Sequence, residues 1–316
     1  MAARTTPRTT TPTSTWTPAD MPSQRGKLAL VTGANSGIGR ETTLALARAG
    51  ARVIMAGRDA AKVNTVADAL RAQVPGADLE PLALDLADLA SVAEAAATVR
   101  AAHPALDLLI NNAGVMAVPE RRTTKDGFEL TFGTNHLGHF ALTGHLLPTL
   151  LAAEAPRVVT VSAIAYRWKT GELTDLNSEE HYRPMGAYAK SKRANVVFTQ
   201  ELARRTRDFN LTAVAVHPGA SLTGLQQHTS RGLQLVSRFL PGMFQPADQA
   251  AWSTLYAATE AAGIASGDFV GPTGRQGMHG SPGVLSVPDT IRSPETGRAL
   301  WTASEQLTGV VPRTGA

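Results

Sequence analysis

The 316-residue chain contains no cysteine. This absence excludes disulfide bonds, thiol catalysis and cysteine-ligated metal sites. Apolar runs of about 18 residues or more are also missing, so the sequence predicts no membrane-spanning helix. An excess of one charge is missing too, because 30 basic and 26 acidic residues leave a net charge of +4. The basic residues are scattered, which gives no indication of nucleic-acid binding, and we expect a cytoplasmic protein.

Residues 1–15 (MAARTTPRTTTPTST) are rich in threonine and proline and contain no acidic residue. A secretory signal needs an apolar core, which this segment does not have. An organellar transit peptide is an alternative, because Arg4 and Arg8 lie among hydroxyl residues, but we expect a disordered tail. Residues 16–316 are long enough to form one α/β domain with a large core.

The most informative stretch is Lys27–Arg40, which reads KLALVTGANSGIGR. Its first residues predict a strand buried on both faces, and the alanine-rich residues that follow the motif predict a helix. Glycines at positions 33, 37 and 39 predict a tight turn between the two. A helix N-terminus behind a glycine turn is a phosphate-binding geometry. The spacing differs from the usual G-x-G-x-x-G, yet the flanking strand and helix favour a nucleotide site over a purely conformational turn.

The rest of the chain alternates between strand and helix patterns. We expect strands at 51–56, 79–86, 106–110, 157–162 and 211–216, and helices at 59–71, 87–102, 132–153, 187–205, 247–262 and 294–307. This order predicts a parallel, doubly wound (Rossmann) sheet in a single domain. Ligands of such sheets bind beyond the carboxyl ends of the strands. The polar residues at those ends are Gly33–Gly39, Arg58, Asp85, Asn112–Gly114, Ser162 and Pro218–Thr223.

Tyr188 and Lys192 lie four residues apart on the helix predicted over 187–205, so they share one face. A lysine cation favours a phenolate, and we therefore expect the pKa of Tyr188 to fall from about 10. Such a tyrosine can exchange a proton during catalysis. The alternative is an ordinary surface pair, since Y-x-x-x-K is a common pattern.

Two further groups of polar residues have simpler interpretations. His136 and His139 are three residues apart and could ligate a metal, but no third ligand is evident, so we expect no metal site. Asp88, close to Asp85, suits the N-cap of the following helix.

Together these motifs resemble the short-chain dehydrogenase/reductase family over residues 16–310. The resemblance rests on TGANSGIG at Thr32–Gly39, NNAG at Asn111–Gly114, TNHLGHF around Asn135, YAKSK at Tyr188–Lys192, and HPG at His217–Gly219 followed by Thr223. The segments TNHLGHF, LNSEEHY and LWTASEQLTGV look like the retinol-dehydrogenase-like and protochlorophyllide-reductase-like branch.

The resemblance implies an NAD(P)-dependent oxidoreductase that acts on CH–OH groups. Tyr188 would exchange a proton with the carbonyl oxygen of the substrate, Lys192 would hold the nicotinamide ribose, and Asn135 would anchor a water. Asp85 would bind the adenine amino group. The implied cofactor-binding residues are Gly33, Asn35, Ser36, Gly37, Ile38, Gly39, Arg58, Asp85, Leu86, Asn112, Ala113, Gly114, Tyr188, Lys192, Pro218, Gly219 and Thr223.

The end of the second strand predicts NADPH over NADH. An NAD-specific site places an acid there to bind the ribose 2′-hydroxyl. Here Gly57 and Arg58 end the strand, and a guanidinium suits a 2′-phosphate. Asp59 follows directly, so the preference is not absolute.

The fifth strand departs from the family pattern, which usually ends in a serine doublet whose second serine binds the substrate carbonyl. Ala163 takes that second place here, and Ser162 is left as the candidate catalytic serine. Successive strand residues point to opposite faces, so Ser162 needs a local bulge to take over. Two functions therefore stay open: an NADP-dependent oxidoreductase, or a low-turnover NADP-binding sensor or interaction protein.

Residues 222–247 are expected to form a mobile apolar lid over the substrate. The lid favours a lipophilic alcohol or carbonyl substrate. Association of long helices into a homo-oligomer is common in the family and stays an open alternative here.

Overall fold

The computed structural model describes residues 16–219, 245–260, 262–274 and 277–313. The predicted tail over 1–15, Thr223 and most of the expected lid over 222–247 lie outside these residues. The described chain starts at Trp16, which is buried edge-to-face against the ring of Tyr256 with a centroid distance of 5.4 Å. A single 3-10 turn, η1 (Pro18–Asp20), then leads toward the sheet.

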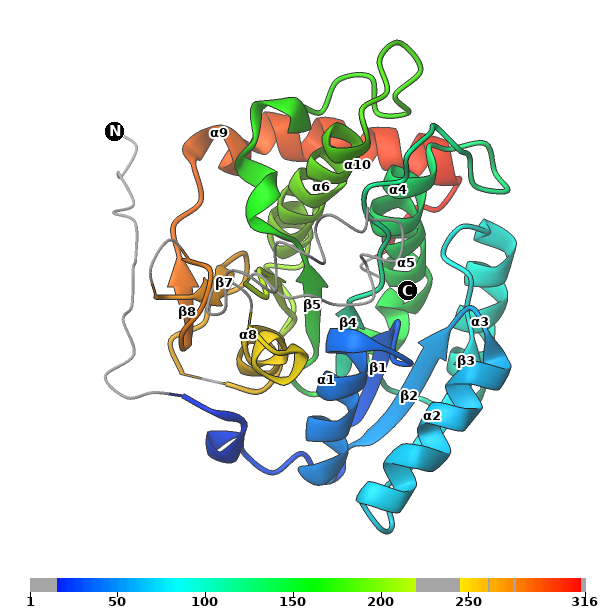
Figure 1. Ribbon diagram of the computed structural model, residues 1–316, viewed down its shortest axis with the longest axis vertical. Coiled ribbons are helices and arrows are strands. Elements are labelled where there is room, and N and C mark those ends of the chain that lie inside the picture. Colours follow the sequence, from blue (N-terminus) through cyan, green and yellow to red (C-terminus); the bar gives the residue numbers. More distant parts are fainter. Residues whose placement is uncertain (1–15, 220–244, 261, 275–276, 314–316) are drawn as a thin grey trace.

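One eight-stranded sheet, in the order β3-β2-β1-β4-β5-β6-β7-β8, forms the centre of the described chain (Figure 1). The strands are β1 (Leu28–Thr32), β2 (Arg52–Gly57), β3 (Leu79–Ala83), β4 (Leu108–Asn111), β5 (Arg157–Val161), β6 (Thr212–Val216), β7 (Phe269–Pro272) and β8 (Pro282–Leu285). Every neighbouring pair is parallel except β7 with β8, which is antiparallel. The predicted α/β, doubly wound Rossmann fold is confirmed.

Helices cover both faces of the sheet. One apolar cluster joins it to α1 (Gly37–Arg48), α2 (Ala60–Gln73) and α8 (Ala247–Thr259). A second cluster joins it to α3 (Leu89–Ala102), α5 (Gly138–Leu151), α6 (Pro184–Arg205) and α10 (Pro294–Thr308). In β1, Ala29 and Val31 belong to the first cluster and Leu28 and Leu30 to the second. The predicted burial of this strand on both faces is confirmed, because alternate side chains point to opposite layers.

The single helix predicted over 132–153 is wrong in its first part. The chain forms the short α4 (Leu130–Phe132), then a π-helical turn, η2 (Gly133–Leu137), and only then α5. The widened turn contains Asn135, whose side chain pairs with both backbone groups of Val115. Its Oδ1 accepts from the Val115 N–H at 2.7 Å, and its Nδ2 donates to the Val115 carbonyl at 2.9 Å. Single π turns of this kind occur frequently at functional sites.

Strand β3 ends at Ala83, three residues before the predicted end at 86. Asp85 turns the chain there, because its Oδ1 accepts from the Ala87 N–H at 3.0 Å and its own N–H donates to the Ser91 hydroxyl at 3.0 Å. The Asp88 carboxylate caps α3, as predicted.

Three elements near the end of the chain were not predicted: β7, β8 and the short α9 (Asp289–Arg292). Each has four residues, and the two strands contain glycine and proline, which are depleted in strands. Pro282 lies on β8 at the edge of the sheet, where a missing backbone N–H is tolerated.

Among the described residues, no helix combines the length and the apolar character that crossing a bilayer requires.

Candidate active site

The turn between β1 and α1 brings bare backbone to the wall of a cavity of about 370 Å³. Gly33 and Gly37 have φ angles of 67° and 50°, which glycine adopts without strain. A Cβ atom on Gly39 would collide with the Gly33 carbonyl oxygen and lie 2.6 Å from Asn112 Nδ2. The backbone at the start of α1 thus lines the cavity beside the side chains of Ser36 and Ile38. A helix N-terminus behind a glycine turn is the geometry that binds phosphate.

The cavity extends from this turn to Tyr188 and Lys192 on α6. All the predicted cofactor residues line it except Gly219 and Thr223. Gly219 follows Pro218 with a φ of 81°, and Gln245 Nε2 donates to the Pro218 carbonyl at 2.6 Å. Thr223 lies outside the described residues. The strand-end rule thus brings distant segments to one place, and the roles of these residues stay predictions.

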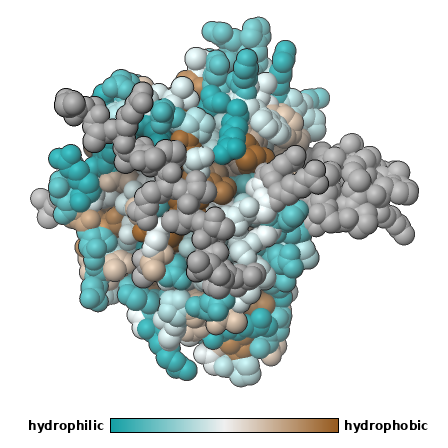
Figure 2. All heavy atoms as spheres, turned by 90° about the vertical axis from the view of Figure 1, so that its left-hand side faces the viewer, coloured by the Kyte–Doolittle hydropathy of each residue, from teal (hydrophilic) through white to brown (hydrophobic). Residues whose placement is uncertain are grey.

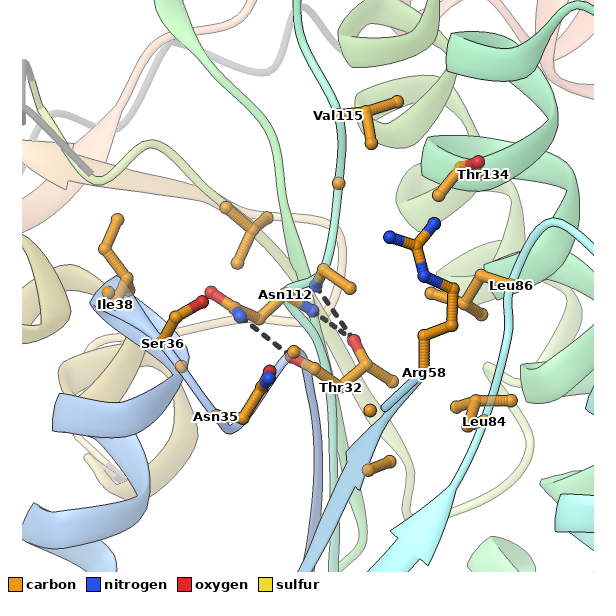
Figure 3. A pocket seen from close by; sticks show the side chains of 18 of the residues that line it. Thr32, Asn35, Ser36, Ile38, Arg58, Leu84, Leu86, Asn112, Val115 and Thr134 are labelled. Atoms are coloured by element: carbon orange, nitrogen blue, oxygen red, sulfur yellow. Dashed lines mark hydrogen bonds between the residues drawn. The ribbon is translucent and has the colours of Figure 1, made fainter. Parts of the chain in front are cut away.

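Thr32 ties the glycine turn to the end of β4. Its hydroxyl accepts from the N–H groups of Asn112 and Ala113, both at 2.9 Å, and its carbonyl accepts from Asn112 Nδ2 at 2.8 Å (Figure 3). On its other side the hydroxyl lies 2.9 Å from Nε2 of His139. These bonds hold the two strand ends that form the floor of the cavity.

The two histidines of TNHLGHF, His136 and His139, are buried, and each forms hydrogen bonds with other residues of the core. His139 Nδ1 donates to the Asn135 carbonyl at 3.0 Å, so Nε2 is free to accept from Thr32. His136 Nε2 lies 2.9 Å from the Ser304 hydroxyl. Burial lowers the pKa of His139 to about 4 and that of His136 to about 3, so both rings are neutral at pH 7. Within the described ranges, no three His, Asp or Glu side chains gather as a metal site would require.

Tyr188 and Lys192 lie together on the buried face of α6. Lys192 Nζ is 5.7 Å from the centroid of the Tyr188 ring and donates to the Val161 carbonyl at 3.0 Å. Burial lowers the pKa of Lys192 to about 8 and raises the pKa of Tyr188 above its ordinary value. The prediction that the pKa of Tyr188 falls is therefore wrong for the protein without a bound cofactor. The cost of desolvating a phenolate outweighs the attraction of a cation at this distance.

Asn135 joins this helix to the segment after β4. In addition to its bonds with Val115, its Nδ2 donates to the Ser191 hydroxyl at 3.0 Å. Ser191 lies between Tyr188 and Lys192, and its hydroxyl donates to the Tyr188 carbonyl at 2.8 Å. The amide of Asn135 therefore holds Tyr188 in place relative to the cavity wall, and its predicted role as a water anchor stays a prediction.

Ser162 and Ala163 have different surroundings. The Ser162 hydroxyl donates to the Lys192 carbonyl at 2.6 Å, which uses its only proton. Ala163 packs against the buried cluster of Tyr188, Ala165 and Ala189. Ser162 nevertheless lines the cavity together with Tyr188 and Lys192.

The opposite end of the cavity carries charges of both signs, from Arg58 and Lys62 and from Asp59 and Asp85. Arg58 follows β2, and its side chain extends toward Thr134 in Figure 3. The neighbouring Asp59 also caps α2, because its Oδ1 accepts from the Lys62 N–H at 3.0 Å. Lys62 also lines the cavity. The sequence analysis did not predict this second cation. Its place in the first helical turn after β2 is the pattern that could have indicated it.

A doubly wound sheet with a glycine turn and a buried tyrosine–lysine pair at one edge defines the class of dinucleotide-binding oxidoreductases. Comparison with known families specifies the class further. The family described as short chain dehydrogenase matches residues 27–234, which is more than half of the chain. The chain belongs to this family, whose members bind NAD(P), and it is an oxidoreductase that acts on CH–OH groups.

Relatives cover nearly the whole chain. Retinol dehydrogenase 12 of Mus musculus is 39% identical over 286 residues, which span 90% of this chain and 87% of that protein. Polyprenol dehydrogenase of the same species is 38% identical over 299 residues, which span 92% of this chain and 87% of that protein.

Solved structures agree with the fold. An uncharacterized protein from Mycobacterium paratuberculosis is 41% identical with a TM-score of 0.77, and the match covers 95% of this chain and all of that one. A protein from Beutenbergia cavernae, assigned as an NAD(P)-dependent gluconate 5-dehydrogenase and crystallised with NADP, is 28% identical with a TM-score of 0.63. That match covers 78% of this chain and 95% of that one.

Proposed function

We propose that the protein is an NADPH-preferring oxidoreductase that interconverts a lipophilic alcohol and its carbonyl compound, with Tyr188 as acid/base. The observation that carries the proposal is one continuous cavity that contains the glycine turn, Arg58 and the Tyr188–Lys192 pair. The N–H groups at the start of α1 would hold the pyrophosphate, and Lys192 would hold the nicotinamide ribose. The absence of a side chain at Gly39 fits this assignment, because a Cβ atom there would collide with the Gly33 carbonyl oxygen and displace the turn.

Charge at the adenosine end supports the preference for NADPH. Arg58 and Lys62 line this end of the cavity together with Asp59 and Asp85. The Asp59 carboxylate accepts a bond from the Lys62 N–H, and Asp85 Oδ1 accepts one from the Ala87 N–H, whereas both cations are available to a phosphate. A guanidinium binds a phosphate through paired hydrogen bonds, and an ammonium adds a point charge. The NADP bound by the Beutenbergia cavernae protein is consistent with this assignment.

Protonation states at the other end support proton donation by Tyr188. When bound, NADPH supplies a hydride to the carbonyl carbon of the substrate. The raised pKa of Tyr188 keeps its phenol protonated at neutral pH, so it can donate a proton as charge develops on the carbonyl oxygen. The Lys192 cation, 5.7 Å from the ring, then stabilises the phenolate that remains. Both residues start a reduction in their resting protonation states, and the oxidation of an alcohol uses the same steps in reverse.

Apolar residues beside Tyr188 support a lipophilic substrate. Met116, Ala163 and Ala165 belong to the apolar cluster that contains Tyr188. The names of the two relatives, retinol and polyprenol dehydrogenase, refer to lipophilic alcohols. The predicted cytoplasmic location and a homo-oligomer stay predictions from the sequence.

The engaged hydroxyl of Ser162 favours a second candidate function. Ala163 packs with Tyr188, and the Ser162 hydroxyl donates its proton to the Lys192 carbonyl. Compared with a site that has the usual serine doublet, this site has one hydrogen-bond donor fewer for the oxygen of the substrate. A protein of this kind could bind NADP and turn over too slowly to serve as an enzyme, acting as a sensor or interaction partner.

The test is NADPH oxidation by the full chain with butanal, dodecanal and all-trans-retinal. Tyr188→Phe removes only a hydroxyl, so NADPH affinity should persist while turnover falls about a hundredfold or more. Tyr256→Phe, a matched loss of a hydroxyl beside Trp16, should leave both unchanged. A Tyr188→Phe variant that keeps its rate would disprove the mechanism. Tight NADPH binding without turnover of any probe would support the second candidate.

A further inference from the structure

We infer that Tyr182 is a positioning residue for the substrate side of the site, where it holds the strained segment Val115–Val118 against Tyr188. The inference rests on the proposed function, because this segment forms part of the apolar surroundings of the proposed acid/base.

The segment is anchored at both ends. At its start, Val115 exchanges two hydrogen bonds with the amide of Asn135, at 2.7 and 2.9 Å. At its end, the Val118 carbonyl accepts a hydrogen bond from the Tyr182 hydroxyl at 2.6 Å. Burial raises the pKa of Tyr182 to about 12, so the hydroxyl remains a donor throughout the pH range of an assay.

Backbone strain lies between the two anchors. Ala117 has a φ of 55°, a left-handed conformation that a residue with a Cβ atom adopts only at a cost in free energy. Such a conformation persists only where its surroundings impose it. The bond to Tyr182 is one residue away and is the contact best placed to impose it.

Met116 links this strain to the site. It precedes Ala117 and packs against the buried cluster of Ala165, Tyr188 and Ala189. If Ala117 relaxed to a negative φ, the direction of the chain at Met116 would change and its side chain would move relative to the ring. The Tyr182 bond therefore sets the wall next to the phenol, where the reacting part of a substrate would lie.

The loop that carries Tyr182 is itself fastened to α6. The buried Lys190, two residues after Tyr188, donates from Nζ to the Asp175 carbonyl and to the Ser178 hydroxyl, the latter at 3.1 Å. The Asp175 carboxylate accepts from the Glu179 N–H at 2.8 Å. Asp175 and Ser178 also have positive φ angles, of 40° and 48°. Lys190 on α6 thus holds the loop that carries Tyr182, and Tyr182 holds the segment Val115–Val118. Met116 of that segment packs back against Tyr188 on α6, so the contacts begin and end on the same helix.

The kinetic test uses Tyr182→Phe, which removes one hydroxyl and keeps the ring. We expect kcat/KM for dodecanal to fall about tenfold, because a wall displaced by a fraction of an ångström misaligns the carbonyl. The Kd for NADPH should not change. Adding Ala117→Gly to Tyr182→Phe should restore most of the loss, since glycine adopts a positive φ without the clamp. Ala117→Val, which makes the strain worse, should reproduce the defect with Tyr182 intact.

A second measurement does not depend on turnover. With methionine labelled at its methyl carbon, the Met116 signal, assigned by its loss in Met116→Leu, should carry the ring-current shift of Tyr188. Tyr182→Phe should move this signal toward the value of a free methionine, and Ala117→Gly should return it. An unchanged signal and kcat/KM in Tyr182→Phe would overturn the inference, as would a loss that glycine does not rescue. A wild-type chain without turnover would contradict the proposed function alone, since the methionine signal still decides the role of Tyr182.

Discussion

The Ser162 hydroxyl donates its hydrogen bond to the main-chain carbonyl of Lys192, 2.6 Å away. The serine at the end of β5 thus stabilises the helix that carries the proposed acid/base. Ala163, the next residue, packs with the Tyr188 ring but has no hydroxyl. Ser162 lines the cavity together with Tyr188 and Lys192, but its proton is engaged by the Lys192 carbonyl. Neither position therefore offers a free hydroxyl proton to a substrate oxygen in this arrangement.

Ala163→Ser should increase the rate. A preorganised donor to a developing oxyanion contributes about 3 kcal/mol, so we expect kcat for dodecanal to rise by up to about a hundredfold. Ser162→Ala should cost about 1 kcal/mol in free energy of unfolding, from the lost bond to Lys192, and change kcat less. Steady-state kinetics and thermal unfolding of both variants measure this. The opposite pattern, an inactive Ser162→Ala and a neutral Ala163→Ser, would make Ser162 the catalytic serine.

Arg58→Ala should weaken NADPH selectively. A hydrogen bond to a charged phosphate contributes about 1.5–3 kcal/mol, so the Kd for NADPH should rise between about tenfold and a hundredfold while that for NADH stays constant. Lys62→Ala should have a smaller effect in the same direction, since its ammonium acts as a point charge. Arg48→Ala, in the last turn of α1, is the matched control at the far end of that helix. Equal catalytic efficiency with both cofactors in the wild type would contradict the assignment.

NADPH affinity should depend on pH through Lys192. Burial lowers the pKa of Lys192 to about 8 in the free chain, so below that pH the lysine is already charged and affinity should be flat. Above it the free chain has lost a proton that cofactor binding restores, so the Kd should rise by up to about tenfold per pH unit. Fluorescence titrations between about pH 7 and pH 9 measure this slope. Lys192→Met should bind more weakly with no slope. If the wild type also shows none, Lys192 does not contact the cofactor.

Local patterns in the sequence were sufficient for much of the fold and for most of the cavity wall. The apolar residues of β1, the positive-φ glycines of the turn and the four-residue spacing of Tyr188 and Lys192 each act over a few neighbouring residues. The strand-end rule then brought the glycine turn, Arg58 and Asn112 together without any knowledge of contacts. Such features are encoded in short windows, because helix and strand periodicity and glycine conformation depend on nearby residues.

Other features were decided only by contacts between distant parts of the chain. The π turn at Asn135 accompanies its two bonds to Val115. The Val118 carbonyl, next to the positive-φ Ala117, accepts its hydrogen bond from Tyr182, 64 positions further along the chain. Asp59 caps α2 as well as lining the cavity. The pKa of Tyr188 rises because the assembled core removes water from it, although the adjacent lysine had indicated a fall. Desolvation and long-range hydrogen bonds arise only when the layers pack, so no local pattern carries them.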